Sequence, residues 1–378
     1  MHLSLPEPDA PVERHLRAIA DAAGRATGVV VATFAAGRTT TLCQGYTDRF
    51  RTTAVTDRTR FEVGSVTKTF TALLLASAAA RTIVRLDEPL SHHIPAWAVP
   101  RGTASESITA HHLATHTAGL PRLPPGFLRT ALPHWWTNPY QAFTPDQLLT
   151  ALSRTRLRHP PGTRRCYSNF GAGLLGHLLA HAADTDYGIL LNRLVLEPLG
   201  LADTTDLPTC VQATGHWHTR PVQPWLIPAL PAAGALRSTA HDLLNYLRCH
   251  IEPDAHTTPG HPINTALHRV LQPLPHARAP LAWTRRDLAE RTLHFHSGGT
   301  RGFTTFTGFS LHPPTALVAM TNTGPTMRGN FIQTAYMALR TLSRSAHVPE
   351  QAVSGTAAGD GALRAQARGG RANWSASS

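Results

Sequence analysis

The stretch Phe61-Glu62-Val63-Gly64-Ser65-Val66-Thr67-Lys68-Thr69-Phe70 places Ser65 and Lys68 three residues apart, ahead of an apolar run. Positions i and i+3 of a helix lie on one face, so a helix that begins here would set the lysine amine beside the serine hydroxyl. The partial positive charge of a helix N-terminus suits negative charge that develops on that serine. Gly64 fits a sharp entry into such a helix. The stretch therefore predicts a central buried helix that presents a serine and a lysine together.

Lys68 is the only lysine among the 378 residues, and the other 34 basic side chains of this type are arginines. Arginine cannot lose its proton in a protein, whereas a buried lysine can become neutral and act as a base. A single lysine beside a serine therefore indicates a site that needs a proton acceptor. A serine three residues before a lysine also arises by chance, so the interpretation depends on the rest of the chain.

The composition is that of a globular protein of one or two domains. No run of 18 apolar residues is present, so no membrane span is expected. Residues 1–14 are polar, acidic and proline-bearing and lack the pattern of a signal peptide, which predicts a cytoplasmic location. The net charge of +12 comes from arginines spread along the chain. We interpret it as solvated surface charge and expect no nucleic-acid or membrane partner.

Neither the cysteines nor the histidines form a recognisable ligand pattern. Cysteines without C-x-x-C spacing in a chain without a secretion signal are expected to be free thiols; they are Cys43, Cys166, Cys210 and Cys249. The histidine pairs His111-His112 and His216-x-His218 have no second ligand pair at a plausible spacing. The sequence therefore predicts no metal and no cofactor.

Strand patterns lie at both ends of the chain and helix patterns lie between them. A helix over residues 12–26 precedes two strands over 28–34 and 39–46, and strands are expected again over 292–296, 303–311 and 316–321. From about 90 to 205 only helices and proline loops are expected; helices are predicted near 108–116, 143–152, 167–179 and 187–196, and later over 240–250 and 331–342.

These patterns predict an α/β (α+β) fold class, with a mixed antiparallel sheet built from both termini, flanked by helices and interrupted by an all-helical domain. The predicted sheet domain comprises residues 1–90 and 225–345, and the helical domain residues 91–224. Residues 346–378 have almost no apolar bulk and are predicted to form a disordered tail. A cleft between the two domains would hold Ser65.

Four short motifs follow one another along the chain: Ser65-x-x-Lys68, Tyr167-x-Asn169, Gly234-Ala235-Leu236-Arg237-Ser238-Thr239 and His296-Ser297-Gly298. With these motifs the chain resembles the class C β-lactamase and D-alanyl-D-alanine carboxypeptidase family of penicillin-recognising serine hydrolases. The resemblance covers about residues 28–325 and implies a β-lactamase/transpeptidase-like fold. The related signature with S-D-N and K-T-G belongs to class A relatives.

The resemblance implies a role for each matching residue. Ser65 would attack a carbonyl and form an acyl-enzyme, while Lys68 and Tyr167 would share the proton transfers. Asn169 would hydrogen-bond the substrate amide and hold Lys68. His296 would assist protonation or contact a substrate carboxylate.

The resemblance also implies an oxyanion hole made by the backbone N–H groups of Ser65 and Gly299, worth about 3 kcal/mol per donor. Gly298 and Gly299 would let the strand backbone approach the substrate. Ser297 and Arg301 complete the expected substrate-binding residues.

Simpler interpretations stand beside these roles. Tyr167 would be an aromatic residue at a helix start and Asn169 a helix cap. His116 would be structural, a cation that suits the dipole at a helix C-terminus. Trp135-Trp136 would be packing or a substrate rim, and Cys166 a small buried residue.

His296-Ser297-Gly298 stands where β-lactamases of this class usually carry Lys-Thr-Gly, which is closer to the carboxypeptidase and esterase branches. Arg285, Arg286 or Arg301 would then supply a cation. Our leading hypothesis is an intracellular esterase, amidase or transacylase that acts on an ester or amide of a small secondary metabolite, with water or an amine as acceptor. The alternative is a β-lactamase or D-Ala-D-Ala carboxypeptidase, and a more distant one is a non-catalytic ligand-binding protein.

Overall fold

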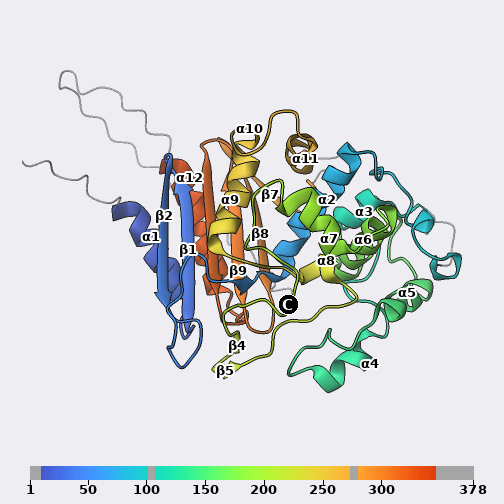
Figure 1. Ribbon diagram of the computed structural model, residues 1–378, viewed down its shortest axis with the longest axis horizontal. Helices are drawn as coiled ribbons and strands as arrows, with labels where there is room; N and C mark the ends of the chain where they lie inside the picture. Colours follow the sequence, from blue (N-terminus) through green and yellow to red (C-terminus); the bar gives the residue numbers. More distant parts are fainter. Residues whose placement is uncertain (1–9, 101–106, 273–279, 346–378) are drawn as a thin grey trace, which may run out of the picture.

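Both ends of the chain build one six-stranded antiparallel sheet in the computed structural model, which describes residues 10–100, 107–272 and 280–345 (Figure 1). The strand order is β2-β1-β10-β9-β8-β7. The strands are β1 (Gly28–Ala35), β2 (Arg38–Gly45), β7 (Thr284–Leu288), β8 (Arg291–Gly299), β9 (Thr304–Ser310) and β10 (Thr315–Thr321). The antiparallel sheet from both chain ends is confirmed. Strand β7 was not predicted, because it is a short polar strand on the sheet edge.

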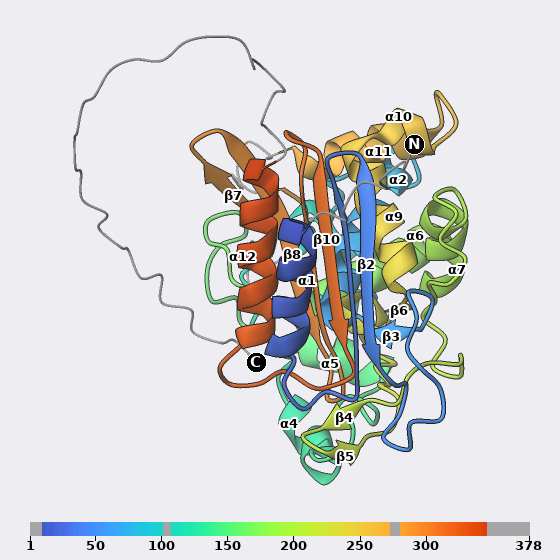
Figure 2. The same cartoon turned by 90° about the vertical axis from the view of Figure 1, so that its left-hand side faces the viewer.

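The central strands are apolar on both faces because helices cover both. In β1 the side chains of Val29 and Val31 join one core cluster, whereas Val30 and Ala32 join the other, as the period-2 alternation of a strand requires. Helices α1 (Ala10–Ala22) and α12 (Asn330–Ser345) lie side by side on the first face, and α9 (Ala240–Ile251) packs on the second (Figure 2).

Helix α2 (Thr67–Ala80) lies inside the second core, and every residue from Thr67 to Ala78 is buried. This confirms the central buried helix. A 3-10 turn, η1 (Gly64–Val66), precedes it, so Ser65 lies in that turn and not in the first turn of the α-helix. Strands β3 (Phe61–Glu62) and β6 (Arg237–Ser238) pair antiparallel directly before this turn, which fixes its position against the rest of the chain.

The remaining elements surround α2 and the open end of the sheet. They are η2 (Leu90–His92), η3 (Ala96–Ala98), α3 (Ala110–Ala114), α4 (Phe127–Ala131), η4 (Leu132–His134), α5 (Pro145–Ser153), α6 (Asn169–Ala182), α7 (Tyr187–Leu191), η5 (Asn192–Leu196), β4 (His216–Trp217), β5 (Arg220–Pro221), α8 (Pro231–Gly234), α10 (Pro253–His256) and α11 (Pro262–Leu271).

Two helices begin at a threonine that caps them. Thr144 caps α5 through a capping box with Gln147, and Thr239 caps α9. Element lengths were less predictable. The helix expected near 108–116 is only five residues long, and the helix expected over 187–196 changes to a π-helix at Asn192.

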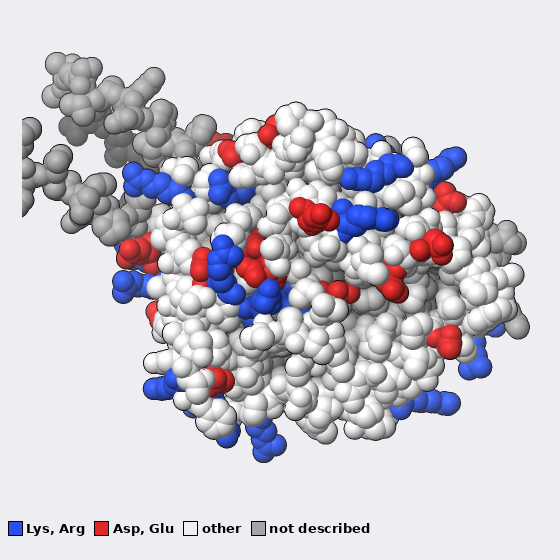
Figure 3. Space-filling view, viewed as in Figure 1, with Lys and Arg blue, Asp and Glu red and all other residues white. Residues whose placement is uncertain are grey.

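The limits of the sheet and helical domains stay a prediction, and the tail predicted over 346–378 lies outside the described residues. No helix in the described parts of the chain combines the length and apolar character that a membrane crossing requires. On the face seen in Figure 3, basic and acidic side chains are interspersed and do not form a continuous basic surface.

Candidate active site

Two polar side chains donate hydrogen bonds to Ser65 Oγ. Lys68 Nζ donates a hydrogen bond to it over 3.0 Å, and Tyr167 OH donates another over 2.7 Å. Lys68 reaches the serine from one turn along the chain, and Tyr167 reaches it from the loop directly before α6. Ser65 is half-buried, and Lys68 is only 3% exposed. A serine oxygen with two proton-carrying neighbours is the arrangement of an activated nucleophile.

The pKa values of Lys68 and Tyr167 are both lowered from their ordinary values. Burial lowers the pKa of Lys68, and its contact with Tyr167 only partly reverses that effect. Burial raises the pKa of Tyr167, but the charge and hydrogen bonding of Lys68, together with the hydrogen bond to Ser65 and the charge of Arg122, outweigh it. The two groups can therefore share a proton, which is what a general base for Ser65 requires.

Two arginines that sequence analysis missed lie around Tyr167. The guanidinium carbon of Arg122 is 5.5 Å from the centroid of the Tyr167 ring, and its charge lowers the pKa of both Tyr167 and Lys68. Arg165 is exposed and acts electrostatically on Tyr167, and its charge helps to lower the pKa of His296. Neither arginine belongs to a recognisable motif, so only the fold reveals them.

His116 is structural but is not the cation that the sequence analysis expected at a helix end. Burial, followed by the charges of Lys68 and Arg165, lowers its pKa well below the ordinary value, so the ring is neutral. Its Nδ1 accepts a hydrogen bond from the backbone N–H of Ser168, and its ring packs 4.7 Å from that of Tyr167. Its backbone is left-handed, with φ of 61°, which is costly for a residue other than glycine. His116 therefore holds Tyr167 in position through its ring contact and its hydrogen bond from the next residue, Ser168.

His296 is also neutral. It is 7% exposed, and burial, then the charge of Lys68, lowers its pKa to about 3. Its Nδ1 lies 2.8 Å from the carbonyl oxygen of Ser297 and donates to it. A neutral imidazole cannot serve as a fixed cation for a substrate carboxylate. The side chain that stands in the lysine position of the strand motif therefore carries no charge.

Asn169 does not hold Lys68, contrary to expectation. Its Nδ2 donates to Tyr140 OH over 3.2 Å, while Lys68 Nζ donates to the carbonyl oxygen of Ala233 over 2.6 Å. Asn169 is also not the cap of α6, because the hydroxyl of Ser168 accepts from the N–H of Gly171 and takes that position. The Oδ1 atom of Asn169 is buried without a protein partner, which leaves one polar atom for a ligand.

Gly298 and Gly64 let two backbone segments touch beside the nucleophile. A Cβ at Gly298 would lie 1.9 Å from the carbonyl oxygen of Val63 and 2.9 Å from the N atom of Ser65. A Cβ at Gly64, where φ is +49°, would lie 2.7 Å from the N atom of Gly299. Gly298 is therefore required by the nucleophile turn and not only by substrate approach. The backbone N atoms of Ser65 and Gly299 are brought to the same side of the site.

The remaining predicted binding residues lie at the rim. Ser297 is half-buried in β8. Arg301 donates to the carbonyl oxygen of Trp135, and its guanidinium carbon lies 4.7 Å from the ring centroid of Trp217. Trp136 is 75% exposed, which excludes a core-packing role for it. Arg301 thus links the turn after β8 to the loop that contains Trp135 and Trp136.

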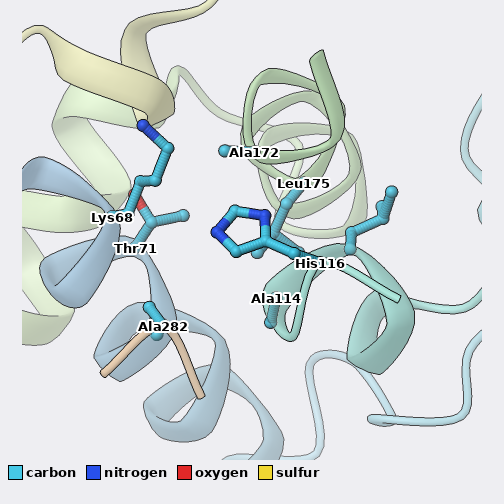
Figure 4. A pocket seen from close by; sticks show the side chains of 9 residues that line it. Lys68, Thr71, Ala114, His116, Ala172, Leu175 and Ala282 are labelled. Atoms are coloured by element: carbon cyan, nitrogen blue, oxygen red, sulfur yellow. The ribbon is translucent and has the colours of Figure 1, made fainter. Parts of the chain in front are cut away.

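The space behind Lys68 is too small for a substrate group. A cavity of about 10 Å³ separates the stem of Lys68 from the ring of His116 (Figure 4), and its other lining residues are mostly apolar. A void of that size holds about one water molecule.

Tyr140 is a further residue that sequence analysis did not select. Its ring packs 5.4 Å from Trp225 and 4.7 Å from Phe127, and its hydroxyl accepts from Asn169. Cys166 is half-buried and not fully buried as expected. Within the described ranges, no three His, Cys, Asp or Glu side chains are placed to hold a metal ion.

A model of the family described as Beta-lactamase matches residues 10–342 of the chain. A beta-lactamase from Providencia stuartii is 31% identical over 203 residues, which cover 52% of this chain and 48% of that protein. The D-alanyl-D-alanine-carboxypeptidase/endopeptidase AmpH from Escherichia coli K12 is 30% identical over 196 residues, covering 51% of this chain and 49% of that protein. The chain thus spans about half the length of these curated relatives.

Two solved structures have the same fold. The crystal structure of a beta-lactamase from Sulfitobacter sp. EE-36 superposes with a TM-score of 0.72 and 22% identity, covering 87% of this chain and 98% of that one. A class C beta-lactamase from Rhodobacter sphaeroides gives a TM-score of 0.72 and 21% identity, covering 88% and 98%. At these identities the likeness concerns the fold alone.

Proposed function

Because the chain belongs to the beta-lactamase family, we propose that it is an active-site serine hydrolase that opens or cleaves the amide of a β-lactam or a D-Ala-D-Ala-type peptide through an acyl-enzyme on Ser65. The observation that carries the proposal is the pair of hydrogen bonds that Lys68 and Tyr167 donate to Ser65 Oγ. The similarity to a beta-lactamase and to a D-alanyl-D-alanine-carboxypeptidase supports this choice over the esterase or transacylase that was the leading hypothesis from the sequence.

The proposed reaction begins when Ser65 Oγ attacks the amide carbonyl carbon and its proton passes to the Lys68–Tyr167 pair. The carbonyl oxygen becomes an oxyanion, which the N–H groups of Ser65 and Gly299 stabilise. The C–N bond then breaks, and the leaving nitrogen takes the proton from Tyr167. Water then attacks the ester carbonyl of the acyl-enzyme and gives a proton to the Lys68–Tyr167 pair. The bond to Ser65 Oγ breaks, the acid is released, and Ser65 regains its proton.

The charges around Ser65 fit this reaction. The groups that shift the pKa values of Lys68 and Tyr167 are each other and Arg122, with no carboxylate of the described residues among them. Positive charge close to the reacting oxygen favours the oxyanion. With His296 neutral, the exposed Arg165 supplies a positive charge near Tyr167 for an anionic substrate group.

A second candidate is ester cleavage or transfer of the acyl group to an amine. The neutral His296 favours it, because a fixed cation on β8 is the feature expected of a β-lactamase. The small metabolite expected from the sequence analysis would then be the acyl donor.

A substrate panel tests the choice. A chromogenic cephalosporin, a D-Ala-D-Ala peptide and p-nitrophenyl esters are each assayed with and without added amines. We expect the cephalosporin or the peptide to reach a kcat/KM above about 10⁴ M⁻¹s⁻¹, within the usual enzymatic range. Turnover confined to esters, with new amide products when amines are added, would replace the first candidate by the second.

A further inference from the structure

The carboxylate of Glu62 is buried three residues before the nucleophile and is fully engaged. Its Oε1 accepts from the backbone N–H of Trp225 over 2.6 Å and from Gln212 Nε2 over 3.1 Å. Its Oε2 accepts from the hydroxyl of Thr300 over 2.6 Å. Glu62 is 2% exposed and Thr300 is 5% exposed. A buried carboxylate with this many partners fixes the segments that supply them.

Arg237 supplies the counter-charge. Its NH2 group lies 3.9 Å from Glu62 Oε1, and its side chain is 2% exposed. It also donates to the carbonyl oxygens of Ala235 and Trp225 and, over 3.3 Å, to Gln212 Oε1. We call Glu62, Gln212, Trp225, Arg237 and Thr300 the Glu62 cluster.

The Glu62 cluster joins the two sides of the proposed oxyanion hole. Glu62 leads through Val63 and Gly64 into Ser65, whereas Thr300 directly follows Gly299. The two segments already touch, since a Cβ at Gly64 would meet the N atom of Gly299 at 2.7 Å. Among the described residues, the Thr300–Glu62 hydrogen bond is the one that joins side chains of these two segments, and it lies one residue beyond the backbone donor.

We propose that Glu62 is a positioning residue that sets the separation of the Ser65 and Gly299 N–H groups through its hydrogen bond from Thr300. The inference rests on the proposed acyl-enzyme function. An oxyanion donor acts only when it points at the place where negative charge develops, and a displacement of about 1 Å costs as much as 100-fold in rate. Thr300 itself touches no reacting atom, so it acts through Gly299.

The test removes only the hydroxyl of Thr300. Thr300→Val deletes the bond to Glu62 and the long, 3.4 Å contact from the N–H of Gly302 while keeping the shape, and Thr300→Ser restores a hydroxyl. The matched control is Thr304→Val, because Thr304 is also a buried threonine, pairs with Gly299 across β8 and β9, and bonds to the carbonyl oxygen of Thr323 over 2.8 Å instead.

Two probes that need no knowledge of the substrate report on the oxyanion hole. A fluorophosphonate forms an O–P bond with Ser65 and releases fluoride, and phenylboronic acid forms a tetrahedral adduct. For Thr300→Val we expect the labelling rate to fall at least about tenfold and the phenylboronic acid Ki to rise by a similar factor, as for a misaligned oxyanion donor. Thr300→Ser should recover most of both, and Thr304→Val should stay within about threefold of the unaltered chain.

Hydrogen exchange separates this proposal from the proposed function. If the unaltered chain fails to react with either probe, the acyl-enzyme function fails before any variant is compared. Even then, exchange of the peptides that span 62–66 and 298–302 must rise in Thr300→Val and not in Thr304→Val. Equal labelling, equal Ki and equal exchange in the two variants would overturn the positioning role of Glu62.

Discussion

Two buried polar regions lie within a few residues of each other and handle charge in opposite ways. In the Glu62 cluster a carboxylate meets Arg237, and its oxygens accept three hydrogen bonds. Around Ser65, the charges that act on Lys68 and Tyr167 include no carboxylate of the described residues. In the Glu62 cluster a neutralised charge holds the backbone, whereas around Ser65 the Lys68–Tyr167 pair exchanges a proton with the reacting oxygen.

The largest expected effect concerns the base. Lys68→Arg keeps a positive charge but removes the only lysine, and arginine cannot accept the proton of Ser65. We expect the labelling rate with a fluorophosphonate to fall by about 10³-fold or more, in the range of a lost general base, with an unchanged midpoint of thermal unfolding. A loss below about tenfold, or 1.4 kcal/mol, would show that Lys68 acts only as a charge.

The next prediction contrasts the stability of the two regions. Arg237→Met leaves Glu62 buried without its counter-charge, so we expect the free energy of unfolding to fall by about 3–5 kcal/mol. Lys68→Met removes a cation that burial already disfavours, so we expect a change within about 1 kcal/mol. Urea unfolding of both variants measures this. A similar loss in the two would mean that the regions do not differ as described.

A third prediction uses two buried histidines that have no role in the proposed reaction. The ring of Phe309 stacks with His250 at 5.3 Å and with His294 at 5.2 Å. Burial lowers the pKa of His250 to about 3 and that of His294 to about 4. A neutral histidine is thus not by itself a sign of catalysis, and His296 must be judged by its neighbours.

These two histidines make stability depend on pH. Below the ordinary value of about 6.5 the unfolded chain binds protons that the folded chain refuses, so stability is complete above about pH 6.5 and is lost as pH falls toward 4 and 3. At pH 5 each contributes a loss of about 2 kcal/mol. The slope of unfolding free energy against pH measures the number of protons taken up on unfolding. His250→Phe should reduce that number by about one. An unchanged slope would contradict the buried neutral state.

The smallest expected effect, on KM, concerns Tyr140, which contacts Asn169 beside the Ser65 site. Tyr140→Phe removes the hydroxyl that accepts from Asn169, and one neutral hydrogen bond is worth about 1 kcal/mol. We expect KM for the preferred substrate to rise up to about tenfold while the fluorophosphonate labelling rate is retained. Tyr187→Phe, which breaks the buried bond to Thr71, is the control and should leave KM unchanged. Equal KM values in both variants would exclude Asn169 orientation by Tyr140.

The sequence predicted what is encoded locally. The serine–lysine pair and the strand alternation depend on residues within a few positions of each other. Contacts between distant segments were not predictable: Arg122 and Tyr140 reach the site from loops without a motif.

One charge state was wrong. His116 was expected to be a cation, but burial keeps its ring neutral, and a sequence does not reveal burial. Asn169 was placed on Lys68, whereas the carbonyl of Ala233, 165 residues away, occupies that position. Burial and long-range hydrogen bonds decided each case.

Covalent labelling of Ser65 is the direct test of whether this residue is the nucleophile. The unaltered chain and Ser65→Ala are each incubated with a fluorophosphonate and with a penicillin, then analysed by intact mass and peptide mapping. We expect one adduct per chain on the peptide that contains Ser65 and no adduct in Ser65→Ala. An adduct of equal yield in Ser65→Ala, or one on another residue, would contradict it.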